Sequence, residues 1–416
     1  MKYYVWLSLC LLNKKTKTAA LLKNFGTPEN IYNLVEKGSE ELCKFIKKGL
    51  KSFFSSTIEE AEAVIAKCVD RGIKIIPYVS KEYPKAFFSL SDFPVCIFAF
   101  GNTAALNSPV VFGACGARSE YEETFREIGR LSFEMSRAGA VVCSGLAYGA
   151  DTAALEGAVL SGGATIGVLG CSIDVNYPMK NRELKKKMLK FGGVLISEYP
   201  IETPAYPANF PIRNRLITAL SDVLLAAPSD NSKGTYITVQ KMLDAEKGLC
   251  TVSCDKSYSH IAYQKLMLLG AKEVFTCSDV MKLYPVEKRA YLSPEKIISG
   301  EYEIRKNAYD NETSAAKKAD ETAKKTQKTV KETEPEKEDK SELTEIKRKE
   351  IIKNFPKGTE EIPLKIFDII ARKESSIEEI IELSAIPAPE VLDHLIRLQI
   401  MGIADTANGK IYKVSK

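Results

Sequence analysis

The sequence predicts an α/β fold with a parallel sheet from two observations between Pro109 and Pro178. First, three short apolar runs, at 110–112, 141–143 and 165–169, are separated by amphipathic segments. This alternation is typical of βαβαβ units whose strands are buried on both faces. Second, a glycine or serine turn follows each run, as expected where a strand gives way to a helix.

The glycines of this stretch fall at the predicted strand-to-helix junctions. They are Gly113, Gly116, Gly145, Gly149 and Gly170. Backbone amides at a helix N-terminus carry partial positive charge and point outward. A row of such junctions at one sheet edge therefore predicts a phosphate-binding rim.

Composition limits the class of protein. A chain of 416 residues with 45% apolar content fits two to four globular domains. The net charge of +5 is too small for a basic-tail nucleic-acid binder, so any anion site must be local. Only His260 and His394 occur, which disfavours histidine-based triads and metal centres.

The cysteines and the N-terminus indicate an intracellular protein. Ten cysteines are spread without a Cys-x-x-Cys motif, so we expect free thiols rather than zinc sites or disulfides. The apolar run 3–12 resembles a signal peptide, but lysines follow at once and no cleavage pattern appears. It is also too short to span a bilayer. We therefore expect a buried helix and a cytoplasmic protein without membrane contact.

Four regions are predicted: 1–80 as a small helical domain, 81–303 as the Rossmann-like domain, 304–355 as a charged disordered linker, and 356–416 as a winged helix. Within the first, 58–70 reads as an amphipathic helix ended by Gly72, and Thr27 or Asn30 as a helix cap. The lysines of this region are compatible with phosphate contact, although a solvated face is the simpler interpretation. Apolar runs at 73–78 and 93–100 are expected to extend the central sheet at its edge.

The C-terminal region shows three helical segments, at 362–371, 376–383 and 388–398, before two strand segments at 403–405 and 410–414. An Ala407-Asn408-Gly409 turn lies between the strands, which predicts the hairpin of a winged helix. The third helix carries Glu390, Asp393 and His394 with only Arg397 basic. A protein contact is therefore at least as well supported as a DNA contact for this domain.

The first candidate site motif is Gly113-x-x-Gly116-x-Arg118, after the first central strand. Glycine permits close approach of a ligand, and the arginine fork suits a phosphate. The full dinucleotide fingerprint is absent, and Ser144-Gly145 stands where an acidic residue would end the second strand, so nicotinamide binding is disfavoured. The alternative is that these glycines serve packing alone.

The second motif runs from Ser144 to Asp151 as SGLAYGAD. Its small residues leave room above the sheet edge. Asp151 suits either a helix cap, which we favour, or a ligand contact. Ser144 is not expected to be a nucleophile, because the domain's only histidine, His260, is distant in sequence.

The third motif is Phe210-Pro211-x-Arg213-Asn214-Arg215, after a proline-rich stretch, 198–211, that we expect to be an irregular loop. Cations at a helix start oppose the macrodipole. Either an anionic ligand or a buried carboxylate such as Glu198 would offset that cost, and both alternatives remain open.

The fourth motif, Lys233-Gly234-Thr235, is an amide-rich turn that lacks Walker spacing, and a plain surface turn is the alternative. No acid–base pair, metal cluster or activated nucleophile emerges from the sequence. The expectation is a binder of phosphate chains with no catalytic residues, no metal and no cofactor.

Several blocks in order resemble the DNA-processing protein A family, also called DprA or Smf. They are Gly116-Ala117-Arg118, SGLAYGADTAAL, TIGVLGCSIDVNYP, SEYP, FPIRNRLITALSD and KGTYIT, within about 105–275. Residues 3–35 resemble the family's helical sterile-alpha-motif-like domain and 360–416 its winged helix. The resemblance implies an extended Rossmann-like domain that binds single-stranded DNA without sequence preference. It also implies loading of the RecA recombinase in natural transformation and a homodimer formed through the Rossmann domain.

The residues and the resemblance together give one predicted DNA site. Its members are Gly116, Arg118, Ser119, Tyr121, Ser144, Gly145, Lys180, Asn181, Phe210, Arg213, Asn214, Arg215, Lys233 and Thr235. Arg118, Lys180, Arg213 and Arg215 are expected to meet phosphates, and Tyr121 or Phe210 to stack on a base.

Two other functions are compatible with the sequence. Lysine-decarboxylase-like phosphoribohydrolases share the architecture and a Gly-x-Gly-Thr turn, but 236–239 reads YITV where their catalytic glutamate should follow. The other alternative is a protein-binding adaptor that uses the winged helix and the tether.

Overall fold

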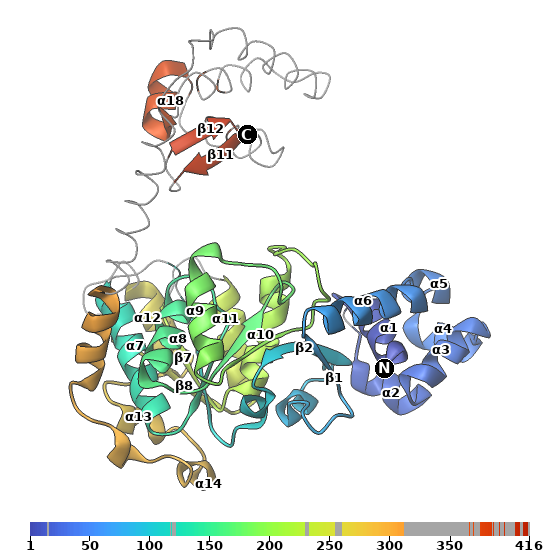
Figure 1. Ribbon diagram of the computed structural model, residues 1–416, viewed down its shortest axis with the longest axis horizontal. Helices are drawn as coiled ribbons and strands as arrows, with labels where there is room; N and C mark the ends of the chain where they lie inside the picture. Colours follow the sequence, from blue (N-terminus) through green and yellow to red (C-terminus); the bar gives the residue numbers. More distant parts are fainter. Residues whose placement is uncertain are drawn as a thin grey trace. The chain divides into compact units, whose positions relative to one another are not determined.

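The computed structural model describes residues 1–14, 16–116, 118, 122–228, 233–253 and 260–311 (Figure 1). Toward the C-terminus it also describes 366, 369, 375–384, 386, 391, 395, 404–407 and 411–414. The chain divides into two compact units, Met1–Ala319 and Asp320–Lys416.

The first unit begins with the small helices that the sequence predicts. They are α1 (Lys2–Leu11), α2 (Thr18–Phe25), α3 (Pro28–Glu36), α4 (Glu40–Ile46), α5 (Leu50–Phe53) and α6 (Ile58–Asp70). Trp6 is buried at their centre, where its Nε1 donates to the Ser56 carbonyl at 2.8 Å. Thr27 caps α3 as predicted, and α6 spans the predicted 58–70.

A nine-stranded sheet follows, in the order β1-β2-β6-β5-β4-β3-β7-β8-β9. The strands are β1 (Lys74–Pro77), β2 (Cys96–Gly101), β3 (Val111–Cys115), β4 (Val141–Ser144), β5 (Thr165–Leu169), β6 (Val194–Ser197), β7 (Val223–Ala226), β8 (Gly248–Thr251) and β9 (Lys272–Glu273). All pairs from β6 to β9 are parallel, whereas β2 pairs antiparallel with β6 and with β1. The apolar runs at 73–78 and 93–100 therefore extend one edge, as predicted.

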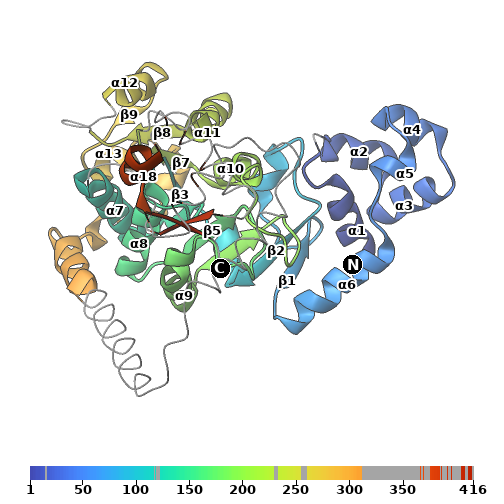
Figure 2. The ribbon, with the colours of Figure 1, turned by 90° about the horizontal axis from the view of Figure 1, so that it is seen from above.

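Helices cover both faces of the sheet (Figure 2). On one face lie α7 (Glu122–Arg137), α8 (Ala150–Ser161), α9 (Arg182–Lys190) and α13 (Cys277–Met281); on the other lie α10 (Asn209–Leu220), α11 (Lys233–Asp244) and α12 (His260–Leu268). Side chains alternate along β3, since Phe112 and Ala114 enter the first core while Val111 and Cys115 enter the second. This is the predicted doubly wound α/β arrangement.

The chain winds from β3 through β4 and β5 to β6, and then resumes at β7 on the other side of β3. Folds of this kind bind ligands at the carboxyl ends of the strands where the winding direction switches, which is here between β3 and β7. Gly116 lies there with φ of +148°, and a Cβ on it would sit 2.5 Å from the Cβ of Ala227. Only glycine fits this position.

Three element boundaries differ from prediction. α10 begins at Asn209, inside the expected loop, because Pro211 is tolerated in a first turn where no N–H is needed. Lys233-Gly234-Thr235 forms the first turn of α11 rather than a turn before it. Residues 304–311 were predicted as linker but continue a helix, 301–311, whose Tyr302 is buried against Phe133. Residues 312–355 lie outside the described part of the chain.

The second unit contains β10 (Ser375–Ser376), α18 (Ile377–Ser384), β11 (Ala404–Ala407) and β12 (Ile411–Val414). The strands form an antiparallel sheet in the order β10-β12-β11. The helix and both hairpin strands agree with the predicted segments to within about two residues. Of the predicted third helix only Val391 and Leu395 are described, and both are buried.

Candidate nucleic-acid interface

The loop after β4 is held by a carboxylate. Asp151 Oδ2 accepts the backbone N–H groups of Gly145 at 3.1 Å and Ala147 at 3.2 Å. The N-cap of α8 is Gly149, without a side-chain cap, so the predicted capping role of Asp151 is wrong. Because the Gly145 amide is already bonded, it is not a free phosphate donor as the sequence suggested.

Two predicted contact residues, Ser144 and Asn181, are structural in this conformation. The fully buried Ser144 Oγ donates to the Ala114 carbonyl at 2.7 Å. Asn181, 4% exposed, donates through Nδ2 to the Leu146 carbonyl at 2.9 Å and to Thr152 Oγ1 at 2.8 Å. Both hold the loop from inside and present no polar atom to a ligand.

Arg213 lies beneath the strand ends, 3% exposed. Its Nη1 donates to the carbonyl of Gly145 at 2.8 Å and to that of Val168 in β5. Nη2 occupies the space beside Gly145, since a Cβ there would lie 2.4 Å from it. The predicted exposed phosphate clamp is therefore a buried brace between two loops and α10.

Arg213 and Asp151 form the electrostatic centre of this region. Burial raises the pKa of Asp151, and the charge of Arg213 opposes that rise most strongly, followed by the amides of Ala147 and Gly145. Burial also lowers the pKa of Arg213, which Asp151 opposes. Arg118 lowers the pKa of the same carboxyl to a smaller extent than Arg213 does.

Arg215 pairs with buried and half-exposed carboxylates, which is one of the two alternatives that the sequence left open. Its Nη2 donates to Glu198 Oε1 at 2.6 Å, and its Nε lies 3.1 Å from Asp92 Oδ2. It lines a cavity of about 240 Å³ with Asn13 and Lys241, apart from the cavity that Arg118 lines. The expected convergence of Arg215 with Arg118 is therefore wrong.

Arg118 is exposed at the end of β3, at the switch point. It lines a cavity of about 270 Å³ with Thr152, Glu156, Tyr302 and Lys306, so helix 301–311 supplies one wall. Ser119 and Tyr121 lie outside the described residues.

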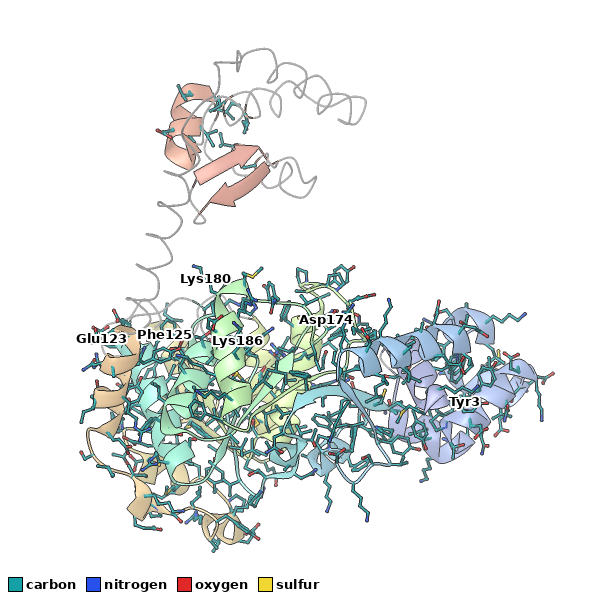
Figure 3. The ribbon with its side chains drawn as sticks, viewed as in Figure 1. Tyr3, Glu123, Phe125, Asp174, Lys180 and Lys186 are labelled. Atoms are coloured by element: carbon teal, nitrogen blue, oxygen red, sulfur yellow. The ribbon has the colours of Figure 1, made fainter. Side chains whose placement is uncertain are left out.

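An aromatic group, hereafter the aromatic rim, consists of the exposed Tyr148, Tyr177 and Tyr206, on the loops after β4, β5 and β6, and the half-buried Phe210 in the first turn of α10. The three tyrosines are 39–55% exposed, and the rings of Tyr177 and Phe210 lie 5.3 Å apart. The exposed Lys180, labelled in Figure 3, places its Nζ 5.9 Å from the Tyr148 ring centroid. None of these three tyrosines is in the site predicted from the sequence, although each follows a predicted strand.

The remaining predicted residues lie on α10 and α11. Asn214 accepts from Arg213 Nε at 3.2 Å and donates to Thr238 Oγ1 at 3.1 Å. Thr235 is 4% exposed, which leaves it no open surface for a ligand. The backbone of Lys233 begins α11, and its side chain is outside the described set.

Among the described residues, no group of three or more His, Cys, Asp or Glu side chains could hold a metal ion. In the same part of the chain, no helix has the length and apolar character needed to cross a membrane.

Comparisons with known proteins agree with this fold. The family model described as DNA recombination-mediator protein A matches residues 74–285. DNA processing protein DprA of Bacillus subtilis is 28% identical over 294 residues, 70% of this chain and 98% of that protein. Protein Smf of Escherichia coli is 33% identical over 172 residues, 41% of this chain and 45% of that protein. The X-ray structure of DprA from Streptococcus pneumoniae superimposes with a TM-score of 0.57 at 23% identity, covering 68% of this chain and 98% of that one.

Proposed function

The chain belongs to the DNA recombination-mediator protein A family, and from that premise we propose that it binds single-stranded DNA without sequence preference. The binding surface is the carboxyl edge of the parallel sheet. The observation that supports this most is the aromatic rim beside Lys180, together with the exposed Arg118 that follows β3 at the carboxyl ends of the strands.

This surface suits unpaired nucleotides for a physical reason. Bases that are not stacked in a duplex can stack on exposed rings, and every base has a π-face, so the contact tolerates any sequence. Exposed cations beside the rings bind the phosphates and release counterions. Arg118 and Lys180 are exposed and, within the described residues, form no ion pair, so their charge is available.

The proposed roles differ within the predicted set. Arg118 and Lys180 contact phosphates, Gly116 packs on Ala227 and so sets the path of the chain that leads to Arg118, and Phe210 supports the ring of Tyr177 at 5.3 Å. Ser119, Tyr121 and Lys233 are proposed as further contacts. Arg213 acts as a brace that holds the loops in place.

The test is fluorescence anisotropy with labelled single- and double-stranded oligonucleotides of several sequences. We expect Arg118→Ala and Lys180→Ala each to weaken single-strand binding equally across sequences and to reduce the salt slope by about one. Lys190→Ala is the matched control, because Lys190 is exposed, lies 6.0 Å from the Phe191 ring centroid and precedes β6, at the amino ends of the strands. Unchanged affinity in both test variants would refute the proposal.

We further propose that the protein loads RecA onto single-stranded DNA in natural transformation, in the cytoplasm. The description of the family as a recombination mediator supports this. The measurement is the rate at which RecA filaments form on protected single-stranded DNA with and without the protein. No acceleration would refute it.

A homodimer formed through the Rossmann domain completes the proposal. Ile261 and Leu268 on α12 and Phe275 after β9 are 58–88% exposed at the end of the sheet. Large exposed apolar side chains grouped at a sheet edge favour association. Leu268→Glu should convert a dimer to a monomer in sedimentation equilibrium, and a monomeric parent protein would refute this part.

We also propose that the C-terminal unit is a winged helix. Its described order, strand, helix and then hairpin, supports this, together with the buried Ile366, Ile380, Val391 and Leu395. The acidic character of the predicted third helix favours a protein partner, and removal of 356–416 should therefore leave single-strand affinity unchanged in the anisotropy assay.

A further inference from the structure

We propose that α6 of the N-terminal helices positions the aromatic rim through an ion-pair clamp made of Lys67, Arg71, Asp174 and Glu202. The inference rests on the proposed single-stranded DNA surface. In this inference, the clamp residues do not touch DNA but hold the aromatic rim in position for binding.

The clamp joins one face of α6 to two loops of the sheet domain. Lys67 and Arg71 are four residues apart, so they project from the same face of the helix. Lys67 Nζ lies 2.5 Å from Glu202 Oε2, and Arg71 Nη2 lies 3.1 Å from Glu202 Oε1. Arg71 Nη1 also pairs with Asp174 Oδ2.

Asp174 joins the two loops to each other. Its Oδ1 accepts from Ser172 Oγ at 2.5 Å and from the backbone N–H of Glu202 at 3.1 Å. The Ser172 N–H donates to the Thr203 carbonyl at 3.0 Å. Burial alone would raise the pKa of Asp174, but the hydrogen bonds and the charge of Arg71 together outweigh burial and leave the pKa below its usual value. The carboxylate is therefore charged at neutral pH.

The same two loops carry two of the rim's three tyrosines. Tyr177 follows Asp174 by three residues in loop 170–178, and Tyr206 follows Glu202 in loop 198–208. Figure 3 labels Asp174 and Lys180 along one edge of the molecule. A shift of the clamped residues therefore moves the rings.

Apolar packing and backbone conformation both support the clamp. Cys68 of α6, Phe98 of β2 and Ile201 form one buried cluster, against which Ile173 packs. Glu202 has φ of +69°, a left-handed conformation that costs a non-glycine residue free energy unless its surroundings hold it. The clamp provides that restraint through both carboxylate oxygens and the backbone N–H.

A second tie to the N-terminal helices lies nearby. Asn13 Nδ2 donates to Asn209 Oδ1 at 3.3 Å, and Tyr199 OH donates to Asn13 Oδ1 at 3.2 Å. Asn209 opens α10 directly before Phe210. The N-terminal region thus contacts the two segments, 170–178 and 198–210, that carry Tyr177, Tyr206 and Phe210.

Substitution of the acidic residues of the clamp distinguishes positioning from long-range electrostatics by the direction in which DNA affinity changes. Removing a negative charge near a polyanion should strengthen binding if only long-range electrostatics matter. Removing a clamp carboxylate should weaken binding if it positions the rim. The two explanations therefore predict opposite changes for Asp174→Asn and Glu202→Gln.

The experiment measures full-length protein on a labelled oligothymidylate by anisotropy at several salt concentrations. We expect each variant to bind about two- to fivefold more weakly, the range for partly exposed ion pairs. The salt slope should stay unchanged, since no phosphate contact is lost. Glu62→Gln is the matched control, because Glu62 also lies on α6 but pairs with Lys2 at 3.1 Å.

A charge exchange separates positioning from general destabilisation. Glu202→Lys adds positive charge yet should weaken binding, and Lys67→Glu combined with Glu202→Lys should restore much of the loss. If the parent protein binds and the two neutralised variants bind as tightly or more tightly, the clamp is refuted while the proposed function stands. If the parent protein does not bind single strands, both are refuted.

Discussion

Replacing Arg213 with methionine distinguishes a brace from a phosphate contact. Methionine approximates the volume of the side chain but removes its charge and donors. The carbonyls of Gly145 and Val168 then lose their donor from Arg213, and each unsatisfied buried acceptor costs about 1–3 kcal/mol. Asp151 also loses the charge that most opposes the effect of its burial, and leaving a buried charge uncompensated costs about 3–5 kcal/mol.

These terms overlap, so we expect Arg213→Met to lower the free energy of unfolding by about 3–5 kcal/mol. A typical domain has about 5–15 kcal/mol in total, so the loss is large. The assay is urea unfolding followed by circular dichroism, with single-strand binding measured on the same samples. Adding Asp151→Asn should recover about 1–2 kcal/mol, since the unpaired charge is removed.

The refuting result is specific. If Arg213→Met unfolds within about 0.5 kcal/mol of the parent and loses DNA binding, then Arg213 acts on DNA directly. That was the role predicted from the sequence.

Three further outcomes are expected. Tyr177→Ala should lower single-strand affinity about 5- to 100-fold in anisotropy, because a stacked base contributes about 1–3 kcal/mol. Gly116→Ala should destabilise the protein in urea unfolding by about 1–3 kcal/mol, since the new Cβ would lie 2.5 Å from that of Ala227. Asp279 should titrate at about 2 by NMR, because hydrogen bonds from Thr276 and Lys282 hold its pKa below 3.8. A lowered folded-state pKa stabilises the protein above pH 4, and that contribution is lost as pH falls from about 4 to about 2.

A control variant accompanies each of the two substitutions, and one result would contradict the expected pKa of Asp279. Tyr291→Ala also removes an exposed ring, 60% exposed, but that ring lies outside the aromatic rim and should leave affinity unchanged. Gly38 has φ of +70°, and no atom lies within 4 Å of the position that a Cβ would take, so Gly38→Ala should cost only backbone strain. If Gly116→Ala lowers the free energy of unfolding no more than Gly38→Ala does, the clash with Ala227 is not the cause. A titration of Asp279 near 4 would show that its capping bonds do not persist in solution.

Local pattern was sufficient to predict most of the sheet. Buried parallel strands leave continuous apolar runs, and the runs at 110–112, 141–143 and 165–169 each became a strand. The alternative pairing of an arginine with Glu198 was also visible, because a cation at a helix start needs a nearby anion. Arg215 has that partner at 2.6 Å.

The roles of Asp151 and Arg213 could not be read from the chain. Whether a carboxylate caps its own helix or bonds amides of the preceding loop depends on how that loop folds back. Arg213 reaches Val168, 45 residues away, across a layer of the fold, and sequence spacing carries no sign of that contact. Likewise, exposure of Tyr177 depends on three loops that pack together.

The antiparallel pairing of β1 with β2 at the flank of the sheet has a consequence for the design of shorter fragments. β1 is four residues long and ends in Pro77, which makes it a poor template for another strand. A fragment that starts after Pro77 would leave the hydrogen-bonding groups of β2 unprotected, and intermolecular strand addition would follow. Deletion studies that remove the N-terminal helices must therefore retain 74–77, or insolubility of the fragment will be mistaken for loss of function.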